Sequence, residues 1–138
     1  MKKLLVAIFI LFLLSTPLAA QTVTWKTANQ VTFAWDASVT ADIPQAQISY
    51  TVLMVSETDT AKANPTVVVA GLTVLEYTIT MNVEDRYFLG VKAVRTVDSA
   101  VVSESTVAWS DDDAATGSNP FGVQFYKTPD PPGGLGTK

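Results

Sequence analysis

The stretch YFLGVKAV, residues 87–94, carries apolar side chains at every second position. Side chains two residues apart along a β-strand point to the same face of a sheet, so this period indicates a strand with one buried face. We expect the strand to continue to residue 97. The residues predicted to share its buried face are Tyr87, Leu89, Val91 and Ala93.

A second long run follows at residues 100–110. Its predicted apolar face consists of Val101, Val107 and Trp109. Asp98 and Ser99 lie between the two runs, and short polar residues of these types favour tight turns between paired strands. The two runs are therefore expected to form a β-hairpin.

Shorter runs of the same period lie upstream and are rich in Val, Thr, Ile, Tyr and Trp, as strands are. Pro65 precedes one of them, and because proline cannot donate to a strand ladder, that strand is expected at a sheet edge. No segment after residue 20 carries a helical stripe. The sequence predicts an all-β fold, either a β-sandwich or a barrel. The upstream strands are expected at residues 23–25, 31–35, 48–54, 66–70 and 74–80.

The first 20 residues, MKKLLVAIFILFLLSTPLAA, combine two lysines, an apolar run and a small-residue end, which is the order of a secretory signal peptide. The apolar run covers 11 residues, fewer than the roughly 20 that a membrane-spanning helix needs, and an uncleaved anchor is the alternative. Cleavage after Ala20 would leave a domain at residues 21–127 and a flexible Pro/Gly-rich tail at 128–138. We expect a secreted or periplasmic protein without a membrane span after cleavage.

The composition excludes several classes of function. The chain has no histidine and no cysteine, so it has no Ser-His-Asp or Cys-His relay, no His/Cys zinc site and no disulfide. Its formal net charge is −4, and it becomes −6 once Lys2 and Lys3 are removed. An acidic chain repels the phosphate backbone, so no nucleic acid is expected as a partner.

The carboxylates that remain give no indication of catalysis. Glycoside hydrolysis needs two acids that face each other across a cleft. Glu84 and Asp85 are neighbours on a turn, whereas Asp36 and Asp42 flank a loop. Neither spacing indicates a cleft, and we expect neither an enzyme nor a cofactor.

Three local patterns together resemble a fibronectin type III domain. VTFAWD, residues 31–36, is similar to the family's second strand, YTV at residues 50–52 to its third, and residues 87–94 to its sixth. Met81 lies six residues before Tyr87, where the family has the leucine beneath its tyrosine corner.

The resemblance covers roughly residues 31–110, with three departures. Met81 replaces leucine, the loop 82–85 lacks the usual Pro-Gly, and Ile48 is one residue closer to Tyr50 than is usual. The resemblance implies an all-β, immunoglobulin-like antiparallel β-sandwich of about seven strands. It also implies a spacer, adhesive module or accessory domain without catalytic residues. The hairpin at 96–100 carries no Arg-Gly-Asp, so integrin-type recognition is not expected.

The aromatic residues have two possible roles. Large aromatic side chains bury much apolar area, so most of them are expected in the core: Trp35, Tyr50, Tyr87 and Trp109. Trp25 lies closer to the N-terminus and is a candidate for stacking against a sugar ring or another partner.

The acidic stretch SDDDAATGSN, residues 110–119, suggests either a calcium loop or a solvated turn. An EF-hand loop that began at Asp111 would have Asp113 at its third position, but Ala115 and Thr116 occupy the fifth and sixth. Asp111 and Asp113 are therefore only a weak calcium candidate, and a turn that ends the preceding strand is the main expectation.

One further strand is predicted after this turn, within residues 119–127, where Phe121, Val123 and Phe125 alternate with other residues. A seven-strand sandwich is complete by residue 110, so this C-terminal strand is surplus. It is expected either to join its own sheet or to pair with a neighbouring subunit by strand addition.

These inferences converge on a non-enzymatic secreted binding or structural module that contacts a protein or a surface glycan. The candidate contact residues are Phe121, Val123, Phe125 and Trp25. The alternative is a self-assembling, homo-oligomeric subunit of a filament or surface layer that donates residues 119–127 to its neighbour.

Overall fold

The computed structural model describes residues 22–133, so the expected signal peptide at 1–20 lies outside the described residues. The expected tail is described only as far as residue 133 and has no regular secondary structure over 128–133. The elements, in chain order, are β1 (Thr24–Thr27), β2 (Gln30–Ala34), the 3-10 helix η1 (Gln45–Gln47), β3 (Ile48–Ser56), β4 (Thr66–Leu72), β5 (Glu76–Thr80), β6 (Asp85–Val97), β7 (Ala100–Glu104), β8 (Ala108–Trp109), α1 (Asp113–Thr116) and β9 (Phe121–Phe125).

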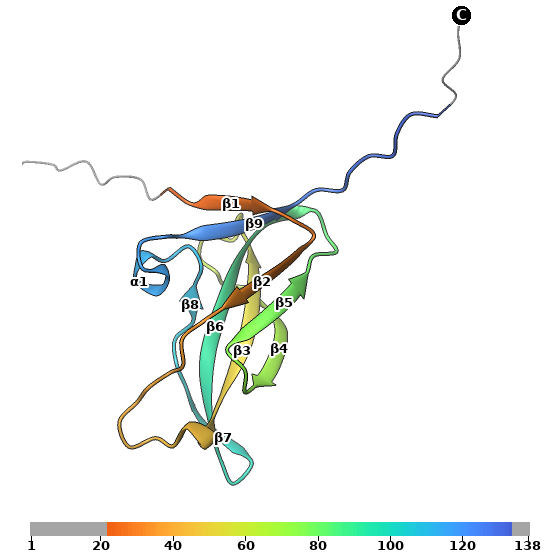
Figure 1. Cartoon of the computed structure of the whole chain (residues 1–138). Coiled ribbons are helices and arrows are strands. Elements are labelled where there is room, and N and C mark those ends of the chain that lie inside the picture. Colours follow the sequence, from red (N-terminus) through yellow and green to blue (C-terminus); the bar gives the residue numbers. More distant parts are fainter. Residues whose placement is uncertain (1–21, 134–138) are drawn as a thin grey trace, which may run out of the picture.

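The strands form two sheets of unequal size, which lie across one another (Figure 1). The larger sheet has the order β1-β9-β6-β3-β4, with β7 and β8 also paired to β6, and the smaller consists of β2 and β5. All pairings are antiparallel except that of β1 with β9. The predicted all-β, immunoglobulin-like sandwich is confirmed, and β4 is at a sheet edge as expected.

The core lies between the two sheets. The predicted period of two holds at Tyr87 and Leu89 of β6, whereas β3 buries the four consecutive residues 50–53. The inward side of β6 supplies Tyr87 and Leu89, and Val52 of β3 lies beside them. The smaller sheet contributes Ile79 of β5, and side chains of β2 pack against the same cluster. The fully or almost fully buried members are Val52, Ile79, Met81, Tyr87, Leu89 and Val123.

A tyrosine corner lies where the chain enters β6. The Tyr87 hydroxyl donates a hydrogen bond to the Val83 carbonyl at 2.9 Å, and Met81 is buried in the core cluster nearby. Burial raises the pKa of Tyr87, and the Asp85 charge adds to the effect, so the phenol stays protonated and can donate. A hydrogen bond of this kind is a recurrent device of immunoglobulin-like sandwiches.

Tyr87→Phe is expected to lower the free energy of unfolding by about 0.5–1.5 kcal/mol, because it removes one partly buried hydrogen bond and leaves the ring in place. Chemical denaturation monitored by tryptophan fluorescence measures the change. Tyr126→Phe is the matched control, since that tyrosine is 55% exposed and should show almost no effect. Equal effects of the two substitutions would contradict a structural role for the corner.

The hairpin between β6 and β7 has the predicted tight turn. Val97 pairs with Ala100, and both central residues have left-handed backbones, with φ of 50° at Asp98 and 66° at Ser99. Two successive left-handed residues make the turn type whose twist matches that of paired strands. Such backbones cost little for glycine and more for other residues.

Ser99→Gly is therefore expected to raise the free energy of unfolding by about 1 kcal/mol. Thermal melting at several scan rates would detect the increase. Ser103→Gly is the control, because Ser103 lies inside β7 in the same hairpin and glycine weakens a strand interior. If both substitutions destabilise the protein to the same extent, the strain inferred at Ser99 is absent.

The prediction of one strand over residues 100–110 is wrong, because the chain forms two short strands, β7 and β8, there. The Ser105 hydroxyl accepts a hydrogen bond from the Ala93 amide at 2.9 Å and donates to the Thr106 carbonyl at 2.7 Å. These bonds replace part of the strand ladder. Val101 is exposed, like the rest of β7, and does not share a buried face with Trp109.

The C-terminal strand β9 belongs to the larger sheet. Along one edge of β6, β7 pairs with residues 94–97, β8 with residues 90–91 and β9 with residues 85–87. Three short strands thus occupy the place of one long strand. The strand that was expected as surplus fills the part of this edge that β7 and β8 leave open.

Candidate functional site

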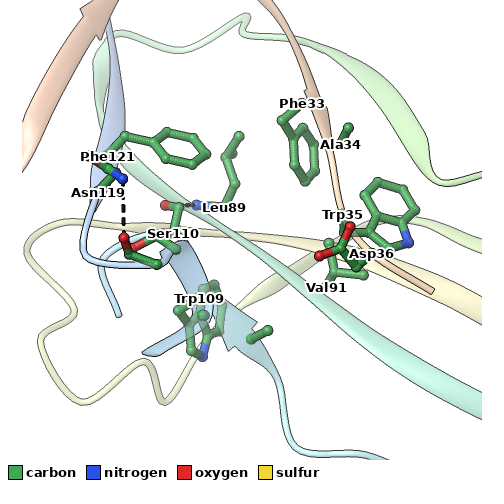
Figure 2. A pocket seen from close by; sticks show the side chains of 14 residues that line it. Phe33, Ala34, Trp35, Asp36, Leu89, Val91, Trp109, Ser110, Asn119 and Phe121 are labelled. Atoms are coloured by element: carbon green, nitrogen blue, oxygen red, sulfur yellow. Dashed lines mark hydrogen bonds between the residues drawn. The ribbon is translucent and has the colours of Figure 1, made fainter. Parts of the chain in front are cut away.

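An apolar groove opens at one edge of the sandwich, between β2 and the segment that comprises β8, α1 and the start of β9 (Figure 2). Its volume is about 670 Å³, within the roughly 300–1,000 Å³ that is usual for ligand sites. Leu89 and Val91 of β6 contribute to its wall between the sheets. The lining residues are Phe33, Ala34, Trp35, Asp36, Leu89, Val91, Ala108, Trp109, Ser110, Ala115, Thr116, Gly117, Asn119 and Phe121.

The groove exists because the smaller sheet has only two strands. The connection between β1 and β2 is short, yet β1 pairs with β9 of the larger sheet and not with β2. Within residues 22–133, no strand therefore covers the side of β2 that faces away from β5. That side borders the groove.

Hydrogen bonds at the two ends of the β2–β5 ladder show which backbone groups face the groove. The Trp35 amide donates to the Leu75 carbonyl, and the Met81 amide donates to the Asn29 carbonyl. Bonded and non-bonded pairs alternate in an antiparallel ladder, so the odd-numbered residues of β2 bond to β5. The amides and carbonyls of Thr32 and Ala34 therefore point away from β5, towards the open edge.

The polar groups on the far wall are mostly paired already. Ser110 is buried, its hydroxyl accepts from the Leu89 amide at 3.0 Å, and its amide donates to the Leu89 carbonyl at 2.8 Å. The Phe121 amide donates to the Ser110 carbonyl at 2.7 Å. The groove thus offers a new ligand both apolar and polar surface, together with the free backbone edge of β2.

Among residues 22–133, Asp36 is the only ionisable side chain that lines the groove, and it is exposed. A glycosidase-like mechanism needs a second carboxylate opposite the first, and the lining contains none. Glu84 and Asp85 have structural partners elsewhere: Glu84 accepts from the Lys127 amide, and Asp85 accepts from the Ser56 hydroxyl at 2.7 Å. Among the described residues, the groove therefore lacks the pair of facing carboxylates that this mechanism needs.

The three consecutive aspartates have separate roles. The Asp111 carboxylate forms an ion pair with the Lys62 ammonium at 2.8 Å. The Asp112 carboxylate accepts from the Ala114 amide at 2.8 Å and caps α1, and Asp113 is the exposed first residue of α1. Between residues 22 and 133, no group of three or more His, Cys, Asp or Glu side chains could hold a metal ion.

The predicted contact residues of β9 face the interior. Val123 is fully buried in the core cluster, and Phe125 packs against that cluster. Phe121 also packs there, and it is the one member of this set that lines the groove. β9 is paired with β6 on one side and β1 on the other, so it could serve a neighbouring subunit only by leaving one of them.

Trp25 lies on the opposite face of the larger sheet from these residues. Its ring covers Gly122, contacts the Phe88 ring at a centroid distance of 5.4 Å, and lies 5.0 Å from the Arg86 guanidinium. The sequence therefore predicted one residue of the groove, Phe121, and the structure does not bring Trp25 to it. Trp35 and Trp109, which also line the groove, were expected only as core residues.

A helix long and apolar enough to span a membrane is not present in the part of the chain that the structure describes. Comparisons of the chain with protein-family models, with curated proteins and with solved structures found no match. The function of the protein is therefore inferred from the groove and its surroundings.

Proposed function

We propose that this protein is a non-enzymatic, secreted binding module of fibronectin type III type, which makes protein contacts through the groove beside β2. The signal-peptide-like N-terminus supports export. The two-sheet sandwich and the tyrosine corner at Tyr87, preceded by the buried Met81, support the type III relationship.

The observation that carries the proposal is an apolar groove next to an unpaired strand edge. Apolar concave surfaces with few polar groups are typical of binding sites. An open edge provides main-chain donors and acceptors in addition. A protein contact is favoured over a surface glycan, because the open edge of β2 presents main-chain groups that an extended peptide backbone can pair with.

Two neighbouring alanines allow a direct test. Ala114 and Ala115 are both exposed on α1, but only Ala115 lines the groove. Ala115→Gln would place a longer neutral side chain in the groove, whereas Ala114→Gln would not, and glutamine is compatible with a helix. Circular dichroism would establish that both variants fold.

The mature chain and both variants would be immobilised and exposed to the extracellular fraction of the native cells, and retained proteins would be quantified by mass spectrometry. The proposal predicts proteins that bind the wild type and Ala114→Gln but are lost with Ala115→Gln. Retention of the same proteins by all three chains, or by none, would contradict it. A photo-crosslinking side chain at position 114, which lies beside the groove and is expected to tolerate a longer side chain, would then identify the contact.

A further inference from the structure

We infer that the groove binds an extended peptide segment of another protein, which adds to β2 as a new edge strand and has apolar side chains at alternate positions and a basic residue beside Asp36. This inference rests on the proposed function and names its class of partner. Its elements are the free edge of β2, the apolar groove and the local charge.

The free edge determines the backbone conformation of the partner. Thr32 and Ala34 direct their amides and carbonyls away from β5, as the phase of the β2–β5 ladder requires. Only an extended segment can satisfy these groups in a ladder, and strand addition is a common mode of peptide recognition. β2 has five residues, so the added strand is expected to be of similar length.

The groove determines the side chains of the partner. A strand that continues the plane of β2 and β5 directs every second side chain between the two sheets. There the side chains would meet the half-buried Val91 of β6 and Phe121 of β9. The intervening side chains would point to solvent, as the outward-facing Thr32 of β2 does. The partner is therefore amphipathic with a period of two.

The charge of Asp36 predicts a basic side chain at the end of the partner strand that lies beside it. Asp36 carries the only charge in the lining and immediately follows Trp35 at the end of β2. The chain as a whole has a formal net charge of −4. Phe121 lies on the other wall of the groove, and the Lys26 ammonium of β1 is 5.3 Å from the centroid of its ring. A Lys or Arg of the partner next to Asp36 would be attracted by this carboxylate and by the acidic chain as a whole.

The test uses the mature chain and three synthetic peptides. The first has three valines that alternate with threonines, with lysine at both ends. The second has the same residues with the valines adjacent to one another, and the third has glutamate in place of both lysines. Fluorescence anisotropy measures binding. The inference predicts that the first peptide binds. The second peptide should bind at least about tenfold more weakly than the first, and the third about two- to fivefold more weakly than the first.

Two proline variants identify the edge that is used. Ala34 and Glu76 are partners across the β2–β5 ladder, and the backbone of each points away from the other strand. Ala34→Pro removes an amide at the groove edge, and Glu76→Pro removes one at the far edge of β5. Ala34→Pro is expected to weaken binding of the first peptide about tenfold or more, and Glu76→Pro to leave it unchanged.

Hydrogen exchange keeps the test valid even if a proline variant fails to fold. In the wild type, the first peptide should slow exchange of the Thr32 and Ala34 amides and leave the Thr78 amide unaffected. Absence of binding by the first peptide, equal binding of the first two, or protection elsewhere would overturn the inference. The proposed function would still stand if Ala115→Gln abolished capture of a protein from the extracellular fraction.

A second copy of this chain is the competing occupant of the edge. Size-exclusion chromatography with light scattering would show a dimer in the absence of peptide, and Ala34→Pro would dissociate it. That result would assign the edge to self-association and would overturn the inference. A wild-type monomer that binds the first peptide supports it.

Discussion

Leu89→Ala is expected to lower the free energy of unfolding by about 2–5 kcal/mol. Leu89 is 1% exposed and lies among Val52, Ile79 and Val123 between the sheets. The substitution removes buried methyl groups and leaves a cavity, and the loss should lie in the upper part of this range if the strands on either side cannot collapse into it. No disulfide compensates, because the chain has no cysteine.

Urea denaturation followed by fluorescence measures this loss. Proteins of this size are stable by only about 5–15 kcal/mol, so the variant should show a clearly lower midpoint. Val101→Ala is the control, because Val101 is 61% exposed on β7 and its truncation should change stability by less than about 0.5 kcal/mol. A loss at Leu89 as small as that at Val101 would contradict the core as described.

Gly122→Ala is expected to cost about 1–3 kcal/mol through steric overlap with Trp25. A Cβ atom at position 122 would lie 2.4 Å from Cζ3 of Trp25, closer than such atoms approach in proteins. The Trp25 ring is also held by the Phe88 ring and the Arg86 guanidinium, so it cannot move away freely. β1 or β9 must therefore shift.

A double-mutant cycle isolates this contact. In a Trp25→Ala background the overlap is absent, and Gly122→Ala should cost little or become slightly stabilising, because alanine restricts the unfolded chain more than glycine does. Equal costs in the two backgrounds would show that the contact is absent. The same cycle tests whether Trp25 is a packing residue, since a tryptophan available for sugar stacking would not couple to Gly122.

The strands could be predicted where the information is local. The strand at residues 87–97 and the Asp98–Ser99 turn depend on the period of the pleat and on a few backbone angles, and both are confirmed. The predicted buried face holds for Tyr87 and Leu89, whereas Ala93 is only half-buried and Val94 is buried. The break between β7 and β8 was missed, because it depends on the hydroxyl of Ser105 and not on the apolar period.

The groove could not be predicted, because it results from the pairing of β1 with β9, a strand far away in the sequence, and not with the nearby β2. Thr24 of β1 pairs with Phe121, 97 residues away, although β2 begins only three residues after β1 ends. Apolar alternation is the same whichever sheet β1 joins. A local signal exists only in retrospect, in Gly122, which leaves room for the Trp25 ring on the larger sheet.

The parallel pairing of β1 with β9 also determines how the domain responds to mechanical force. The described chain enters β1 at one end of this pair and leaves β9 at the other (Figure 1). Tension between residues 24 and 125 would therefore shear the two strands along their length and load their hydrogen bonds together. These bonds include those from the Thr24 amide to the Pro120 carbonyl and from the Ala28 amide to the Gln124 carbonyl. A domain pulled from both ends would resist extension until the hydrogen bonds between β1 and β9 broke together.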